Sequence, residues 1–277
     1  MRKIMVLTLS MLCALVVYSS AVFAWDDLIY IDRHAKIGAQ GDMLGALGIR
    51  YSTAGDRYDK DSKKQDLGDN TTGIRVPLWG RYNIIDNLDA FAILPVVSVD
   101  DGVNSESGIG DIWLGAKYAI MPGGTLTVRG ALDIPSGDDK KGLGNVGGFG
   151  IDIAAMTEQK IEKLSVFAQL GVRYNGEDGD TKWKPGIGFY IQGRAGYDIT
   201  DRFPGWVSLT YFNQDDGEAD GSKLSNSLVN WLELEVGGSY KITNELWVSV
   251  PLQYTLTGTN TMSDLGIGVV VGYYLGK

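Results

Sequence analysis

Apolar and polar residues alternate along most of this chain, and the alternation continues over long runs. From 246 to 256 every second residue is Leu, Val or Tyr, and residues 265–275 repeat the pattern with mostly glycine on the opposite face. Strict alternation over about ten or more residues predicts a β-strand with one apolar face. Strands of this length are unusual in soluble sheets. The pattern therefore predicts an all-β protein.

Twelve such segments are predicted, and the links between them alternate between short and long. The segments span residues 42–53, 72–83, 87–99, 109–120, 124–136, 148–157, 163–174, 186–199, 205–214, 227–242, 245–257 and 264–275. The short links are 84–86, 121–123, 158–162, 200–204 and 243–244, and the long polar links are 54–71, 100–108, 137–147, 175–185, 213–226 and 258–263. This order is typical of an outer-membrane barrel with short periplasmic turns and long external loops. We therefore predict an antiparallel transmembrane β-barrel of about 12 strands over residues 42–277.

A soluble β-sandwich or a lipocalin-like barrel is the alternative architecture. Strands of about ten to fourteen residues match the length that crosses a bilayer at a tilt. The apolar face is continuous in each strand, and the opposite face carries charges that a soluble core could not hold in such number. The pattern favours the membrane barrel.

The first 24 residues have the features of a secretion signal. Arg2 and Lys3 precede a mostly apolar run from 4 to 17, and residues 21–24 supply an A-x-A cleavage site. No later run of about 18 apolar residues predicts a membrane helix. We predict a signal peptide at 1–24 and a periplasmic N-terminal segment at 25–41, which could be a short helix or an extended plug. The expected location is the outer membrane of a Gram-negative bacterium.

Charge and cysteine content narrow the function classes. The chain has 25 Lys and Arg against 34 Asp and Glu, a net charge of −9, which excludes a basic nucleic-acid binder. The one cysteine, Cys13, lies in the predicted signal, so thiolate chemistry is not expected in the mature chain. The expected partners are outer-membrane lipid and small-molecule solutes, and the oligomeric state stays open.

Assigning the apolar face to lipid leaves a charged face for the lumen. Its candidate lumen or selectivity residues are Arg50, Arg75, Arg81, Asp111, Lys117, Arg129, Asp133, Asp152, Arg173, Arg194, Asp198, Glu233, Glu235 and Lys241. These charges could simply pair across strands in a wet interior, as any polar lumen allows. Alternatively, an arginine-rich wall could select anionic or polar solutes.

Aromatic residues fall on both faces of the predicted strands. Those pointing inward are Trp79, Trp113, Tyr190, Trp231 and Trp247, and an outward girdle contains Tyr51, Tyr82, Tyr118, Tyr174 and Tyr240. The inward set could fill a narrow lumen or stack on aromatic or sugar solutes. The acidic external links offer oxygen ligands for Ca²⁺, but no complete EF-hand loop is present. No metal or cofactor is predicted.

A barrel enzyme is a weaker hypothesis. The only histidine, His34, precedes the first strand, so a Ser–His pair inside the barrel is not expected. Glu233 and Glu235 share one strand face, which alternation explains as luminal charge. We predict no catalytic residue and no enzyme activity.

Two segments resemble a known family. Residues 107–118, SGIGDIWLGAKY, resemble the G-x-G-D…G-x-K-Y strand of outer-membrane proteins named for the meta-cleavage (MetA) pathway of phenol degradation. Residues 131–137, ALDIPSG, are similar to that family's following strand, which often ends in a Pro-Thr/Ser-Gly corner. The chain departs from the usual barrel ending because its last strand stops at Lys277 without a terminal Phe. The resemblance implies an outer-membrane barrel of channel or transporter type.

Together these features predict a passive or partly selective channel for small polar or aromatic solutes, with a charged, narrow lumen. The long link at 54–71 could fold inward as a constriction. The alternative is a structural barrel whose external loops act and whose lumen is not open.

Overall fold

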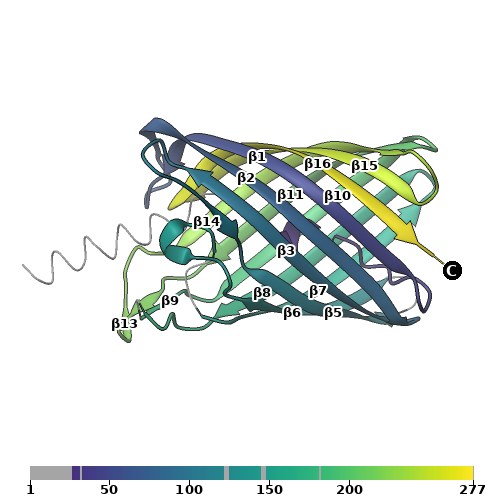
Figure 1. The fold of residues 1–277 in the computed structure, drawn as a ribbon, viewed down its shortest axis with the longest axis horizontal. Helices are drawn as coiled ribbons and strands as arrows, with labels where there is room; N and C mark the ends of the chain where they lie inside the picture. The colour runs from purple at the N-terminus through teal and green to yellow at the C-terminus, as the bar shows by residue number, and fades with distance from the viewer. Residues whose placement is uncertain (1–26, 32, 122–124, 145–147, 181, 277) are drawn as a thin grey trace, which may run out of the picture.

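The chain folds into a closed antiparallel barrel with strongly tilted strands (Figure 1). The computed structural model describes residues 27–31, 33–121, 125–144, 148–180 and 182–276. The predicted signal peptide at 1–24, with Cys13, lies outside the described residues.

Twelve strand positions make up the wall, which confirms the predicted strand number. They are β1 (Met43–Tyr58), β2 (Lys64–Ile85), β3 (Leu88–Asp100), β4 and β5 together (Ser105–Ile109 and Ile112–Met121), β6 (Leu126–Ile134), β7 (Gly150–Ile161), β8 (Leu164–Asn175), β10 (Gly188–Thr200), β11 (Phe203–Gln214), β14 (Val229–Lys241), β15 (Leu246–Thr259) and β16 (Thr261–Leu275). Each pairs with its neighbour in sequence, and the β1–β16 pairing closes the barrel. Closure leaves no sheet edge exposed to lipid.

The outer surface of the barrel is apolar, and the inner surface is buried. On β1, Leu47 and Ile49 are 53% and 52% exposed, whereas Ala46 before them and Arg50 after them are buried. The five predicted girdle tyrosines all lie outward, with exposed fractions from 44% to 49%. A soluble protein would bury this apolar face, so the alternation describes a wall solvated by lipid. Among the described residues, no helix is long and apolar enough to cross a membrane.

The long links gather at one end of the barrel with small elements of their own. These are the 3₁₀ helix η2 (Asp139–Lys141) and the two-residue strands β9 (Trp183–Lys184), β12 (Glu218–Ala219) and β13 (Ser222–Lys223). The short turns and the C-terminal end of β16 lie at the opposite end (Figure 1). By the usual topology this second end is periplasmic.

The predicted inward constriction by residues 54–71 is wrong. β1 and β2 continue past the apolar band as a paired hairpin, with Asp56 opposite Asp66. β16 also pairs with the β1 arm of this hairpin, as far as Tyr58. Alternation missed these extensions because residues outside the membrane need no apolar face to form a ladder. The predicted link at 258–263 is similarly reduced to a turn at Asn260, whose φ is 49°.

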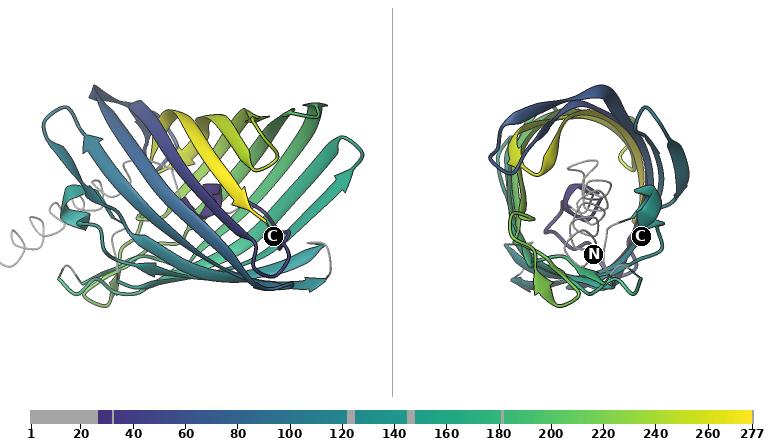
Figure 2. Two further views of the ribbon diagram at one scale, coloured as in Figure 1. Left: turned by 45° about the vertical axis from the view of Figure 1, so that its right-hand side comes forward. Right: turned by 90° about the vertical axis from the view of Figure 1, so that its left-hand side faces the viewer.

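A short helix lies inside the barrel. α2 (Asp27–Ile31) occupies the lumen, where Leu28 and Ile29 have no exposed surface (Figure 2). The luminal position of α2 differs from the periplasmic location expected for residues 25–41. Of the two expected conformations, a short helix and an extended plug, the structure shows the helix over Asp27–Ile31. Its apolar side chains lie against luminal aromatics, which removes them from water in a way that a periplasmic site would not.

Candidate functional site: the lumen

Luminal side chains hold the backbone of the N-terminal segment. Arg129 donates from Nη1 to the carbonyl oxygen of Leu28 at 3.3 Å, and Gln169 donates to that of Ile29 at 3.2 Å. Further along, Lys117 Nζ donates to the carbonyl of His34 at 3.0 Å. A one-turn helix leaves its carbonyls without intrahelical partners, so donors in the barrel wall satisfy them.

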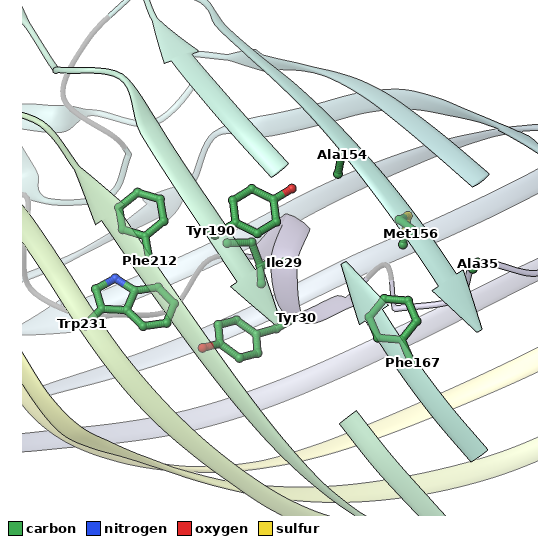
Figure 3. Close-up of a cluster of buried hydrophobic side chains, with 9 residues drawn as sticks. All are labelled: Ile29, Tyr30, Ala35, Ala154, Met156, Phe167, Tyr190, Phe212 and Trp231. Atoms are coloured by element: carbon green, nitrogen blue, oxygen red, sulfur yellow. The ribbon is translucent and has the colours of Figure 1, made fainter. Parts of the chain in front are cut away.

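The same segment packs on two groups of buried apolar side chains. The first contains Ile29, Tyr30 and Ala35 from the segment with Ala154, Met156, Phe167, Tyr190, Phe212 and Trp231 from the wall (Figure 3). The second surrounds Leu28 and contains Leu44, Ala46, Trp79, Phe91, Ile93, Trp113 and Ala131. Four of the five inward aromatics are therefore buried in these groups and fill the lumen beside the helix. Sequence reasoning missed Phe91, Phe167 and Phe212.

A buried network centres on Asp152. Its Oδ1 lies 3.1 Å from Arg129 Nη2, and its Oδ2 lies 3.2 Å from Arg173 Nη2. The hydroxyl of Tyr190 donates to Asp152 Oδ1 at 2.9 Å and accepts from Arg129. Asp152 and Arg129 have no exposed side-chain surface. Asp152, Arg129 and Arg173 all belong to the predicted luminal charges, and their network holds the wall and the helix together.

Other predicted cations pair with acids that sequence reasoning did not select. Lys117 Nζ lies 3.5 Å from Asp89 Oδ2, and Arg81 Nε lies 3.7 Å from the same oxygen. Arg50 Nη2 lies 3.2 Å from Asp264 Oδ2. Asp89 and Asp264 lie at the ends of the predicted segments 87–99 and 264–275, where alternation is least informative. Following the inner face to the ends of these two segments would have found them.

Ion pairs also attach the N-terminal segment to the wall. Arg75 Nη1 lies 3.0 Å from Asp27 Oδ2. Arg33 binds Glu235 with both guanidinium Nη atoms, one of them at 2.7 Å, and Trp206 Nε1 donates to the same carboxylate at 2.6 Å. Sequence reasoning treated residues 25–41 as outside the barrel and therefore missed Arg33.

Burial and charge set the ionisation of the N-terminal segment. Burial raises the pKa of Tyr30 well above its usual value, and the neighbouring Glu233 adds to this, so the phenol stays neutral. Burial by itself would lower the pKa of Arg33, but the charge and hydrogen bonds of Glu235 raise it, so the guanidinium stays cationic.

Asp111 stabilises a loop and does not line the pore. Its Oδ1 accepts from the backbone N–H of Gly137 at 2.9 Å, and Ser136 Oγ donates to the carbonyl of Gly110 at 2.8 Å. These bonds join the two segments that carry the family resemblance, 107–118 and 131–137. The shared motif therefore builds a corner at the external end of the barrel.

A cavity of about 570 Å³ opens beside the N-terminal segment toward the periplasmic end. We term it the vestibule. Its cationic lining residues are Arg33, Lys36, Arg50, Arg81, Lys160, Arg194 and Lys241, and its acidic ones are Glu158, Asp198 and Glu235. The excess of cations contrasts with the net charge of −9 for the whole chain. A low-dielectric wall strengthens such a local field.

The predicted luminal charges thus divide into two groups. Those lining the vestibule are Arg50, Arg81, Arg194, Asp198, Glu235 and Lys241. Those elsewhere on the inner face are Arg75, Asp111, Lys117, Arg129, Asp133, Asp152, Arg173 and Glu233. Within the vestibule, Arg194 places its guanidinium 4.4 Å from the ring centroid of Trp206.

Metal-ligating side chains do not gather in the part of the chain that the structure describes. Those residues contain no group of three or more His, Cys, Asp and Glu side chains placed to hold a metal ion. His34 lines the vestibule with 47% of its side chain exposed, and its Nδ1 lies 4.0 Å from Glu158 Oε2. The expected location outside the barrel was wrong for His34, because the segment that carries it lies in the lumen.

A closed wall of tilted strands with an apolar outer face and a charged lumen defines an outer-membrane β-barrel. Residues 36–270 match the family described as "Putative MetA-pathway of phenol degradation", and the chain belongs to that family. The resemblance of residues 107–118 and 131–137 is thereby confirmed. No curated protein was found to match the chain.

Solved structures share the fold at low sequence identity. The COG4313 outer membrane channel of Pseudomonas putida F1 is 18% identical, with a TM-score of 0.74 over 87% of this chain and 98% of that one. The translocator domain of the autotransporter NalP from Neisseria meningitidis is 11% identical, with a TM-score of 0.55 over 85% and 89%. A mutant of the monoaromatic hydrocarbon channel TodX is 11% identical, with a TM-score of 0.51 over 90% and 93%.

Proposed function

We propose that this protein is a passive outer-membrane channel that admits small polar or aromatic solutes, anions above all. The vestibule carries this proposal, because it combines seven cationic side chains with Trp79, Trp206 and Trp247 in one luminal cavity. Cations attract a carboxylate, and indole faces stack on an aromatic ring. The solved channel of P. putida and the monoaromatic hydrocarbon channel support the proposal through their shared fold.

Single-channel recording of the mature chain, refolded into a planar bilayer, tests the proposal. Discrete salt-dependent current steps are expected, with reversal potentials that favour anions. In that state residues 42–277 form the conducting barrel and the N-terminal segment lies in its lumen. A correctly inserted barrel without current steps would remove the channel proposal.

Reversing charge in the vestibule should reverse part of the selectivity. In Arg194→Glu with Lys241→Glu, the cationic excess disappears, so the reversal potential should shift toward cations. Lys141→Glu is the matched control, because Lys141 is exposed on η2 at the external end. An unchanged reversal potential in the double variant would show that the vestibule does not set selectivity. Arg129 is unsuitable for this test because it is bound to Asp152 in the network that holds the wall.

A closed lumen is the second candidate, and the position of α2 favours it. The helix lies in the middle of the barrel (Figure 2). Aromatic side chains of the wall pack around it. In that case the external loops would perform the function. Recording before and after removal of the N-terminal segment separates this candidate from the open channel.

A further inference from the structure

The cations of the vestibule differ in whether a carboxylate neutralises them. In the part of the chain that the structure describes, four of the seven are in ion pairs, namely Arg33, Arg50, Arg81 and Lys160. The three without an ion pair are Lys36, Arg194 and Lys241. Both lysines are exposed, so water screens their charge, whereas Arg194 is half-buried. Arg194 therefore keeps more of its attraction for an anion than either lysine.

Trp206 positions the guanidinium of Arg194. The Cζ atom of Arg194 lies 4.4 Å from the centroid of the Trp206 ring. This ring is fixed in turn, because Nε1 donates to Glu235 Oε1 at 2.6 Å and because Trp206 packs on Gly237 of the next strand. A Cβ at Gly237 would lie 2.4 Å from Trp206 Cζ2, so only glycine leaves room for the ring.

Glu235 contacts the same indole but is occupied by other donors. Arg33 donates to both of its oxygens, and Gln253 Nε2 donates to Oε2 at 2.9 Å. With the bond from Trp206, four hydrogen bonds fill the roughly four acceptor positions of a carboxylate. Arg33 of the N-terminal segment thereby neutralises the acid that would otherwise be available to Arg194.

Arg194 has an aromatic residue on each neighbouring strand. Phe167 is its ladder partner on β8, and Trp206 belongs to β11. Both side chains line the vestibule together with Arg194. Among the described residues, the guanidinium N–H groups of Arg194 donate to no side chain or carbonyl. The vestibule therefore holds an unpaired, forked donor with aromatic surface beside it.

We propose that Arg194 anchors a binding site for the carboxylate group of small aromatic acids, with Trp206 as the residue that positions it. The proposal rests on the channel function above and names the class of solute that the vestibule retains. The arginine fork matches a planar carboxylate with two parallel N–H···O bonds, which chloride cannot form. Arg33 acts indirectly, because it keeps Glu235 from neutralising Arg194.

Calorimetric titration of benzoate into the mature chain, refolded in detergent micelles, measures this site without any current. One benzoate per barrel is expected. Benzamide, which has a similar shape but no charge and one acceptor oxygen, should bind at least about tenfold more weakly. Arg194→Lys keeps the charge but removes the fork, so the Kd for benzoate should rise about tenfold. Arg202→Lys is the matched control, because Arg202 is exposed in the turn between β10 and β11 and lies outside the vestibule lining.

Two substitutions of Trp206 separate positioning from folding. Trp206→Ala removes the ring under Arg194 and leaves every charge in place, so it should weaken benzoate binding. Trp206→Phe restores an aromatic face without the N–H, and it should recover part of the affinity. The gel shift of the folded barrel verifies folding of each variant. Equal affinities in Trp206→Ala and Trp206→Phe would show that the ring does not position Arg194.

The indirect role of Arg33 has its own test. Arg33→Gln should weaken benzoate binding, because the charge of Glu235 then turns to Arg194. Arg33→Gln with Glu235→Gln has the same formal charge as the wild-type chain and should restore the binding. Persistent weakening in this double variant would contradict the role given to Arg33.

Two results would overturn the site as a whole. One is the same benzoate affinity in the wild-type chain and in Arg194→Lys, and the other is a folded wild-type barrel that does not bind benzoate. The channel itself is judged separately by its current. A barrel that binds benzoate but conducts no ions would remove the channel and keep the site, whereas an anion-selective current without benzoate binding would keep the channel and remove the site.

Discussion

A chain lacking residues 25–35 should conduct several-fold more current than the intact mature protein. The deletion removes α2 and the stretch up to Ala35, which fill the lumen between two groups of buried side chains. A barrel of about 12 strands is wide enough to pass small solutes when its lumen is empty. The deletion also removes Asp26, Asp27, Asp32 and Arg33, so the formal charge of the chain becomes more positive by two units. The current is therefore compared at about 1 M salt, where charges are screened and an increase reports the cross-section of the lumen.

Point variants make this prediction specific. Asp27→Ala with Arg33→Ala cuts both ion pairs that attach the segment to β2 and β14 but keeps the chain in place. It should give a conductance between those of the intact and deleted forms, with frequent transitions as the segment leaves and returns. Lys36→Ala is the control, because Lys36 is exposed at the vestibule. Equal conductance in the intact and deleted chains would place the constriction elsewhere.

Asp152→Asn should be among the most destabilising single substitutions in the barrel. It removes the carboxylate charge that Arg129 and Arg173 share, and these two guanidinium groups have at most 6% of their side chains exposed. Removing one partner of a buried ion pair costs about 3–5 kcal/mol of unfolding free energy. The loss is measured by urea-induced unfolding in detergent micelles or by the temperature at which the band of the folded barrel disappears in gel electrophoresis.

Asp198→Asn is the matched control for that prediction. Asp198 also lies on the inner face and pairs with Lys160 at 2.7 Å, but the two side chains are 28% and 49% exposed. Water screens such a pair, so its loss should cost about 0–1 kcal/mol. Equal destabilisation by the two substitutions would show that burial does not decide the strength of these pairs, and that water enters the Asp152 network.

For the luminal charges, sequence reasoning predicted the correct face of each strand but did not identify the ion-pair partners. Arg129, Arg173 and Asp152 were all placed on the inner face by alternation, and all lie there. Alternation gives the face of each residue because successive side chains point to opposite sides of a strand. It does not give the register between strands, so the pairing of Lys117 with Asp89 could not be derived. Selectivity roles for these residues stay predictions.

The tertiary structure decided everything that depends on the N-terminal segment. Residues 27–35 are too short and irregular to carry a periodic signal, and their burial depends on a lumen that exists only after the barrel closes. The vestibule follows from this placement, because its boundary includes Arg33, His34 and the far wall together.

The sequence by itself determined the membrane barrel, its strand number and the two faces of its wall. These properties depend on local alternation, which lipid outside and a polar lumen inside impose on every strand. Only the tertiary structure decided what fills the lumen and which charges neutralise one another. Those properties depend on contacts between residues far apart in sequence, such as Arg33 with Glu235, and no periodic pattern records such contacts.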